Sequence, residues 1–438
     1  MSRGLLSRRC SSVLLAALLV AACLLLGGAT PNEAASRTPL LLISIDGFRW
    51  DYLDRYPAPA LRRLAAEGVA ARSLIPVFPS KTFPNHYTIV TGLYPESHGI
   101  VDNTMADAEL GRFSLGNRDS VSDGRWWGGE PIWVTAQRQG LLSATCFWPG
   151  SEAEIAGVRP TYWMKYDAQL DGDERVRTVL GWLDLPAERR PTLLTLYWSD
   201  IDSAAHRSGP DSSDAAAAIE RVDGWMAQLL EGLEQRGLYD RVNLVVVSDH
   251  GMASTPAAQT IYLEDYVDLD GIEITGGTPS LLLRPPPERV EIVRGKLARA
   301  HSALSVWRRE QTPRRWHFRD NPRIPPLLVA ADEGWNLRAR HEPAPREGAT
   351  EPLSAPLGMH GYDPRLPSMQ GILIGHGPGL ASKTRTGSIE NIHLYELMCR
   401  LLAIEPARNE GRLSAVKRLL ARSPVNRLTE AASATTSR

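Results

Sequence analysis

Apolar residues gather in three short runs along the chain, and an acidic residue follows each run. The runs occupy residues 40–45, 192–198 and 242–248, and they are rich in Leu, Ile and Val with little polar alternation. This pattern is typical of parallel strands that helices cover on both faces. Ligands of such sheets bind at the carboxyl ends of the strands, so we expect the functional site beside these acidic residues.

Other segments predict helices and further strands. Residues 57–68, 130–140 and 211–237 each have a helical pattern that ends in Gly, and the first begins near a Pro. Additional strands are expected at residues 142–148, 278–283, 326–330 and 371–375. The sequence therefore predicts an α/β fold, a sandwich with a central, mostly parallel sheet flanked by helices.

The first 35 residues have the pattern of a signal peptide. Three Arg residues precede an apolar stretch at 13–26, and small residues follow it. The stretch is shorter than the roughly 20 residues of a membrane span, so export to the periplasm or medium is predicted, with a retained anchor as the alternative. Cys23 ends a lipobox-like Val-Ala-Ala-Cys, but the apolar residues continue past it, which argues against lipidation.

The remaining chain is expected to fold as one domain over residues 38–411. Residues 412–438 end in Ser, Thr and Ala and predict a flexible tail. Residues 338–357 are dense in Pro, Arg and Glu and predict an exposed loop. Cys146 and Cys399 remain outside the signal segment; isolated cysteines are usually buried as small apolar residues, and a disulfide between them is the alternative.

The charge balance argues against a nucleic-acid groove. The 438 residues include 49 Lys and Arg and 50 Asp and Glu, a formal net charge of −1. Binding a nucleic-acid backbone needs a basic face, whereas a small anionic substrate can be met by a bound metal ion. The chain contains no Walker loop, no Gly-x-Gly-x-x-Gly and no Gly-x-Ser-x-Gly motif.

Histidines accompany the strand-end acids. The six side chains are Asp46, Asp202, His206, Asp249, His250 and His360. Asp202 and His206 are four residues apart and would share a face of a helical turn. Asp249 and His250 are adjacent in sequence. Each pair alone could be a solvated surface pair or a turn, but together the six predict a site for a zinc-like metal.

Thr82 is the candidate nucleophile. It lies in Lys-Thr-Phe-Pro-Asn-His, ahead of a helix predicted at residues 88–93. A hydroxyl at a helix N-terminus is most often a cap. Facing metal ligands, however, it could attack a substrate, and the helix terminus would favour anionic substrate oxygens.

Several motifs in order resemble the nucleotide pyrophosphatase/phosphodiesterase family of the alkaline phosphatase superfamily. They occupy residues 43–48, 79–92, 94–100, 129–133, 147–152, 248–252 and 360–362. The resemblance runs from about residue 40 to 411 and implies an alkaline-phosphatase-like catalytic domain of the bare, bacterial type.

The resemblance also implies two zinc ions and a set of site residues. One ion would be held by Asp202, His206 and His360, and the other by Asp46, Asp249 and His250. Thr82 matches the nucleophile that bridges towards the metals, and Asn103 matches the asparagine that supports a phosphate oxygen. Phe83, Tyr166 and Tyr197 match an aromatic slot for a nucleobase, which Leu115 would line.

The activity implied is hydrolysis of nucleotide phosphodiester and pyrophosphate bonds through a nucleotidyl-threonine, releasing nucleoside 5′-monophosphates. Small nucleotides or other phosphodiesters are the expected partners, with no membrane span in the mature chain. The alternatives are a phospholipase-C-type enzyme that releases choline phosphate, a phosphomonoesterase, and a metal-binding protein without catalysis. One departure is that Ile201 and Ala205 precede Asp202 and His206, where many members have Pro and Gly. The ligand spacing is kept, but the leaving-group preference stays open.

Overall fold

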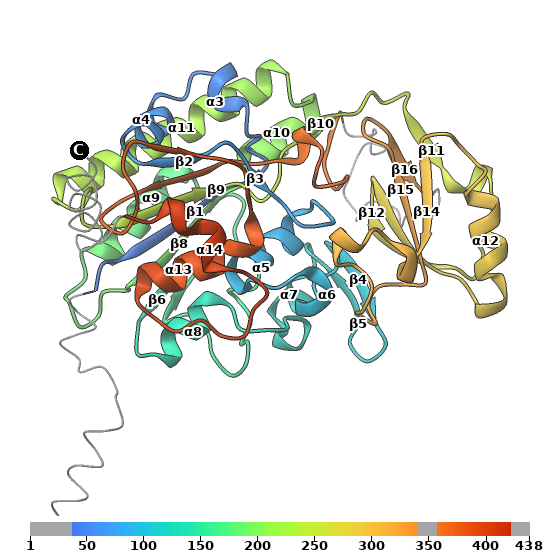
Figure 1. The fold of residues 1–438 in the computed structure, drawn as a ribbon, viewed down its shortest axis with the longest axis horizontal. Helices are drawn as coiled ribbons and strands as arrows, with labels where there is room; N and C mark the ends of the chain where they lie inside the picture. Colours follow the sequence, from blue (N-terminus) through green and yellow to red (C-terminus); the bar gives the residue numbers. More distant parts are fainter. Residues whose placement is uncertain (1–36, 340–356, 422–438) are drawn as a thin grey trace, which may run out of the picture.

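The computed structural model describes residues 37–339 and 357–421. Its main element is an eight-stranded sheet with the strand order β19-β2-β18-β9-β1-β8-β6-β7 (Figure 1). The strands are β1 (Leu40–Ile45), β2 (Val69–Ala71), β6 (Ser143–Cys146), β7 (Tyr162–Trp163), β8 (Leu193–Trp198), β9 (Asn243–Val247), β18 (Leu373–His376) and β19 (Thr384–Thr386). β9, β1, β8, β6 and β7 are parallel, and β18 runs antiparallel to both of its neighbours.

Helices cover both faces of this sheet. Leu41, Ile43 and Ile45 of β1 pack into a core with α4 (Pro59–Glu67), α9 (Gly172–Leu183) and α11 (Ser213–Gln235). Leu40 and Leu42 point the other way, into a core with α5 (Thr82–Thr91), α8 (Ile132–Arg138) and α13 (Leu394–Leu402). Burial on both faces explains the uninterrupted apolar run, and the predicted α/β class is confirmed.

The individual elements match the expectations in part. The helices expected at 57–68, 130–140 and 211–237 are α4, α8 and α11, and the strands expected at 142–148 and 371–375 are β6 and β18. The strands expected at 278–283 and 326–330 also form, but their assignment to the central sheet is wrong. They are β13 (Ser280–Arg284) and β15 (Leu327–Ala331) of a separate antiparallel sheet.

This second sheet has the order β12-β13-β15-β14 and lies to the right in Figure 1. It adds β12 (Glu273–Gly277) and β14 (Leu304–Arg308), and α12 (Val290–Leu297) packs beside β14. Leu281 and Leu283 pack into the core of this lobe, whereas Leu282 contacts the main core. The strand is buried on both faces, so its apolar run looked like that of a parallel strand.

The end of the described chain is ordered, in contrast to the expected tail from 412. α14 (Leu413–Val416) and η8 (Lys417–Leu419) follow, and the side chains of Val416 and Leu419 are buried. Leu420 forms a bridge with Leu380. The prediction of a flexible tail is therefore wrong for residues 412–421, and residues 422–438 lie outside the described residues.

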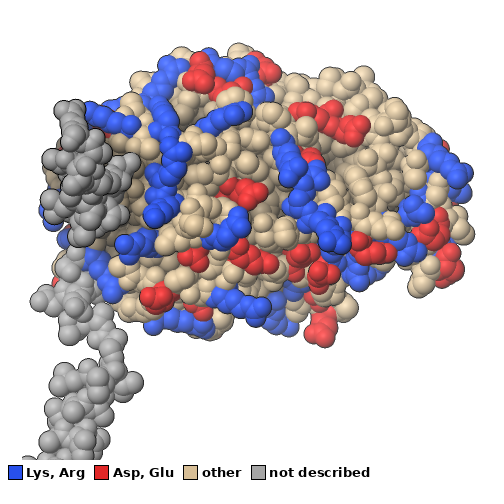
Figure 2. Space-filling view, in the orientation of Figure 1, with Lys and Arg blue, Asp and Glu red and all other residues tan. Residues whose placement is uncertain are grey.

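Three other expectations concern the two cysteines, the leader and the loop at 338–357. Cys146 and Cys399 are both buried free thiols, as expected of small apolar residues. The leader at 1–35 lies outside the described residues, and so does most of the loop expected at 338–357. Within the described ranges, no helix combines the length and apolar character needed to cross a membrane. Basic and acidic side chains are interspersed on the face shown in Figure 2.

One stability prediction concerns Asp223, a buried residue of α11. Its carboxylate accepts hydrogen bonds at 3.0 and 2.9 Å from the backbone N–H groups of Ala60 and Leu61, in the first turn of α4. Asp223→Ala would leave both donors buried without a partner, so we expect the free energy of unfolding to fall by about 2–3 kcal/mol. Urea unfolding followed by circular dichroism measures this.

Glu220→Ala is the matched control, because Glu220 is an exposed acid on the same helix. We expect it to change the free energy of unfolding by less than about 0.5 kcal/mol. Equal effects of the two substitutions would show that Asp223 does not hold α4 in place.

Candidate active site

Three neighbouring strands bring their terminal acids together. β1 pairs with β8 on one side and β9 on the other, in parallel register. Asp46 follows β1 directly, Asp249 follows β9 after one residue, and Asp202 lies in the first turn of α10 (Asp200–Ser208), which follows β8. The pairing of these strands therefore brings the three acids together at one edge of the sheet.

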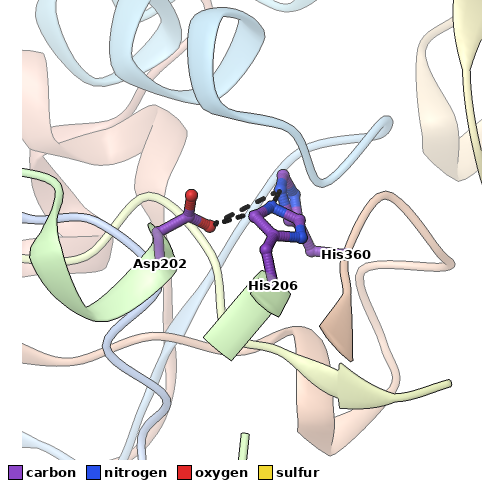
Figure 3. A group of neighbouring side chains, drawn as sticks. All are labelled: Asp202, His206 and His360. Carbon is purple, nitrogen blue, oxygen red and sulfur yellow. Dashed lines mark hydrogen bonds and ion pairs between the residues drawn. The ribbon is translucent and has the colours of Figure 1, made fainter. Parts of the chain in front are cut away.

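The first group of ligand-type side chains consists of Asp202, His206 and His360. In Figure 3 the carboxylate of Asp202 points at both imidazole rings. Its Oδ1 lies 3.3 Å from His206 Nε2 and 3.7 Å from His360 Nε2, and the two Nε2 atoms are 3.1 Å apart. α10 supplies the pair four residues apart, and His360 follows the short strand β17 (Gly358–Met359).

The second group lies deeper and consists of Asp46, Asp249 and His250. His250 Nε2 is 3.4 Å from Asp46 Oδ1 and 3.0 Å from Asp249 Oδ2. All three side chains are buried. The two groups adjoin, because ligand atoms of Asp46, Asp202 and His250 lie within 4.8 Å of one another, and the rings of His250 and His360 stack at 3.5 Å.

Backbone carbonyls fix the tautomer of each of the three histidines. His206 Nδ1–H donates to Gly358 O at 2.8 Å, and His250 Nδ1–H donates to Gly251 O at 2.9 Å. His360 Nδ1–H donates to Ser80 O at 2.8 Å. With Nδ1 bound to a carbonyl oxygen in this way, every Nε2 points into the site. Such a backbone partner is usual for a metal-binding histidine, because it orients the ring.

The electrostatics of the site call for a cation. In the described part of the chain, Asp46 Oδ1, Asp202 Oδ1 and Asp249 Oδ2 are buried without a hydrogen-bond partner. Burial, and then the carboxylates of Asp249 and Asp202, raise the pKa of Asp46 well above its usual value. Burial lowers the pKa of His250, but the carboxylates of Asp249, Asp46 and Asp202 together outweigh burial and raise that pKa to about 10. A metal ion could replace the proton held there, so this donor set fits metal ions.

Thr82 faces the second group. Helix α5 begins at Thr82, six residues before the start expected at 88, because Pro84 is tolerated in a first turn. The helix has Lys81 as its N-cap residue and no side-chain cap, so the hydroxyl of Thr82 is not the cap. Thr82 Oγ1 instead lies 3.3 Å from His250 Nε2.

A cavity of about 260 Å³ joins these groups to an aromatic wall. The predicted residues that line it are Asp46, Thr82, Phe83, Asn103, Leu115, Tyr166, Tyr197, Asp202, His206 and His360. Asn103 Oδ1 accepts a hydrogen bond of 2.9 Å from the backbone N–H of Phe83. This contact uses the oxygen of the Asn103 side chain, and its NH2 group is the hydrogen-bond donor. Leu115 is 45% exposed, so it lies at the rim of the cavity.

Sequence reasoning missed the contact that Tyr197 makes. Its ring lies 6.2 Å from that of Tyr166, as a member of the aromatic wall would. Its hydroxyl, however, donates a hydrogen bond of 2.7 Å to Asp46 Oδ2 and orients that carboxylate. Only the parallel pairing of β1 with β8 brings the two together, so no local sequence signal indicated it.

His86 was also missed, although it lies in a motif that carried the resemblance. The ring lies within ligand distance of Asp46 and Asp249. However, its Nδ1–H donates to Thr82 O at 2.9 Å and its Nε2 accepts from Ser44 Oγ at 2.8 Å. Both nitrogens are used, so His86 orients the start of α5 and is not placed as a metal ligand.

Arg118 and Glu152 form the third unexpected feature. They are joined as an ion pair, and both line the cavity. Glu152 Oε1 also accepts a hydrogen bond of 3.0 Å from the backbone N–H of Tyr166. This contact connects the pair to the aromatic wall.

Comparison with known proteins shows the family of the chain. The family profile described as Type I phosphodiesterase / nucleotide pyrophosphatase matches residues 40–363. The chain is 38% identical over 405 residues to venom phosphodiesterase CdcPDE of Crotalus durissus collilineatus, covering 90% of this chain and 48% of the relative. It is 39% identical over 395 residues to human ectonucleotide pyrophosphatase/phosphodiesterase family member 1, covering 87% of this chain and 42% of the relative.

The fold is similar to solved structures as well. Murine ectonucleotide pyrophosphatase/phosphodiesterase 5, as an inactive variant in complex with AMP, has a TM-score of 0.82 and 34% identity, and the match covers 88% of this chain and 100% of that chain. The human protein of the same type has a TM-score of 0.81. The chain spans less than half the length of the two curated relatives above. It belongs to the type I phosphodiesterase / nucleotide pyrophosphatase family.

Proposed function

We propose that this chain hydrolyses phosphodiester and pyrophosphate bonds of small nucleotides and releases nucleoside 5′-monophosphates. The observation that carries the proposal is the cavity in which the Thr82 hydroxyl faces two Asp and His groups beside an aromatic wall. The names of the relatives, which are phosphodiesterases and nucleotide pyrophosphatases, support the same reaction class.

Two zinc ions are proposed for the two groups of ligands. Asp202, His206 and His360 would hold one ion, and Asp46, Asp249 and His250 the other. The oriented Nε2 lone pairs and the unpartnered carboxylate oxygens support this assignment. When bound, a pair of zinc ions supplies a Lewis acid that stabilises charge on the attacking and leaving oxygens of an in-line displacement.

The chain's own residues would carry the covalent step. Thr82 Oγ1 forms a bond to phosphorus while the bond to the leaving alcohol or pyrophosphate breaks, which gives a nucleotidyl-threonine. Water then attacks phosphorus, releases the nucleoside monophosphate and restores the hydroxyl. The Asn103 amide would donate to a non-bridging oxygen, a role worth on the order of 2–4 kcal/mol of barrier.

The aromatic wall would hold the nucleobase. Phe83, Tyr166 and Tyr197 line the cavity, and Leu115 lies at its rim. Base stacking contributes about 1–3 kcal/mol and tolerates different bases. The murine relative was solved in complex with AMP, which supports a nucleoside monophosphate as a ligand of this chain.

Export is proposed as the location. The pattern of residues 1–35 supports a signal peptide, and the relatives include venom and ectonucleotide enzymes by name. The final compartment would be the periplasm or the medium.

The proposal is tested by comparing kcat/KM for three substrates on the purified protein. The substrates are a nucleotide diester, a phosphocholine diester and a phosphate monoester. We expect the nucleotide diester to be preferred by at least about tenfold, because stacking energy can be used at the reacting phosphorus. A preference for the phosphocholine diester or the monoester would assign the corresponding alternative activity, and no turnover of any substrate would leave a metal-binding protein.

Substitution of Thr82 tests the covalent step. We expect Thr82→Ala to keep its bound metal and lose nearly all turnover, and Thr82→Ser to keep part of it. Mass spectrometry of the quenched reaction should find the nucleotidyl group in the wild type and in Thr82→Ser. Activity of Thr82→Ala within about tenfold of the wild type, a barrier change of about 1.4 kcal/mol, would favour direct attack by water.

Substitution of the aromatic wall tests the base slot. We expect Phe83→Ala and Tyr166→Ala to lower kcat/KM for a nucleotide diester by about 10-fold or more, since each removes a stacking surface. Bis-p-nitrophenyl phosphate, which has no nucleobase, should lose less. Equal losses for both substrates would mean that these rings support the fold alone.

A further inference from the structure

A buried ion pair stands beside the proposed nucleophile without reaching the cavity. Lys81 Nζ lies 2.7 Å from Asp102 Oδ2, and the two residues are 3% and 1% exposed. Lys81 precedes Thr82 in sequence, and Asp102 precedes Asn103. Neither charged residue lines the cavity, so neither is positioned to touch substrate.

The second sheet completes the surroundings of this pair. Lys81 Nζ also donates to Gly277 O at 2.8 Å and Ser280 O at 3.4 Å, at the turn between β12 and β13. Thr104 Oγ1 donates to Gly276 O of the same turn at 2.7 Å. The turn therefore holds both the segment before Thr82 and the segment that carries Asn103.

Further contacts tie the pair to the other site residues. The backbone N–H of Phe83 donates to Asn103 Oδ1, so the two segments are also joined on the cavity side. The aliphatic stem of Lys81 packs against Gly361, next to His360. A β-carbon added at Gly361 would lie only 3.0 Å from Lys81 Cε.

Stability alone does not account for two buried charges here. A buried ion pair is often replaceable by apolar residues of similar volume with no loss of stability. Hydrogen bonds from a lysine ammonium and to a carboxylate, by contrast, fix distances and directions that apolar contacts leave loose. We therefore interpret the Lys81–Asp102 pair as fixing the relative position of the two segments that carry Thr82 and Asn103.

We propose that Lys81, Asp102 and the turn at residues 276–280 form a positioning device for the proposed reaction. The device would set the distance between the Thr82 hydroxyl and the Asn103 amide, so that nucleophile and oxyanion donor meet one phosphorus group. Through this turn, the second lobe would position the reacting groups without touching the substrate. This inference rests on the proposed function.

The double variant Lys81→Met/Asp102→Leu tests the device, because it removes both charges and leaves neither unpaired in the interior. We expect kcat for a nucleotide diester to fall about 100-fold, the scale expected for a misplaced reacting group. KM should change by less than about threefold and bound zinc should be unchanged. Orthovanadate, which mimics the five-coordinate phosphorus, should bind more weakly, whereas AMP should bind as before.

A control variant is Arg323→Met/Asp107→Leu. This ion pair at 2.8 Å joins the same two lobes and is 12% and 19% exposed, but it does not line the cavity. We expect it to lower Tm and to leave kcat within about twofold of the wild type. Lys81→Gln/Asp102→Asn keeps a neutral hydrogen-bonded pair and should recover part of kcat; it also serves if the first double variant does not fold.

Three results would overturn the inference. Wild-type kcat in Lys81→Met/Asp102→Leu would make the pair structural only. Equal kcat losses in that variant and in the control would assign the effect to docking of the lobes. A rise in KM for the diester with unchanged kcat would place the pair in substrate binding. Failure of the proposed function is recognised separately, since the wild type would then turn over no nucleotide diester.

Discussion

The structure depends on the crowding of three carboxylates, two buried and one partly buried, at the ends of β9, β1 and β8. The parallel pairing of these strands brings Asp249, Asp46 and Asp202 close together, and each has one carboxylate oxygen without a hydrogen-bond partner in the described part of the chain. Buried anions of one sign are unfavourable unless positive charge joins them. The Nε2 atoms of His206, His250 and His360 all point towards these carboxylates.

The elements around the carboxylates position the other side chains of the cavity. Backbone carbonyls hold the histidine tautomers, and Tyr197 and His86 hold Asp46 and the start of α5. The N-terminus of α5 presents Thr82 to the site, and the wall of aromatic rings extends the cavity away from it. The nucleotide proposed as substrate would place its charged phosphate and its base in different parts of this one cavity.

The sequence predicted the elements in which the local pattern of apolar residues or the residue spacing reflects burial and side-chain placement. β1 was predicted with its observed bounds because both of its faces are buried, and the four-residue spacing of Asp202 and His206 survived the unusual Ile201 and Ala205. The same rule misassigned β13, whose Leu281 and Leu282 face two different cores. The roles of Tyr197, His86 and Lys81 depend on contacts between segments far apart in the chain, which no local pattern contains.

Metal titration tests whether the strand-end carboxylates and histidines hold two zinc ions. The metal-free protein would be titrated with zinc while bound metal is measured by elemental analysis and turnover of a nucleotide diester is followed in parallel. We expect activity to rise to a plateau at two zinc ions per chain, and His360→Ala to bind one ion less. Full activity without metal, or two full equivalents of zinc in His360→Ala, would contradict the proposed pair of zinc sites.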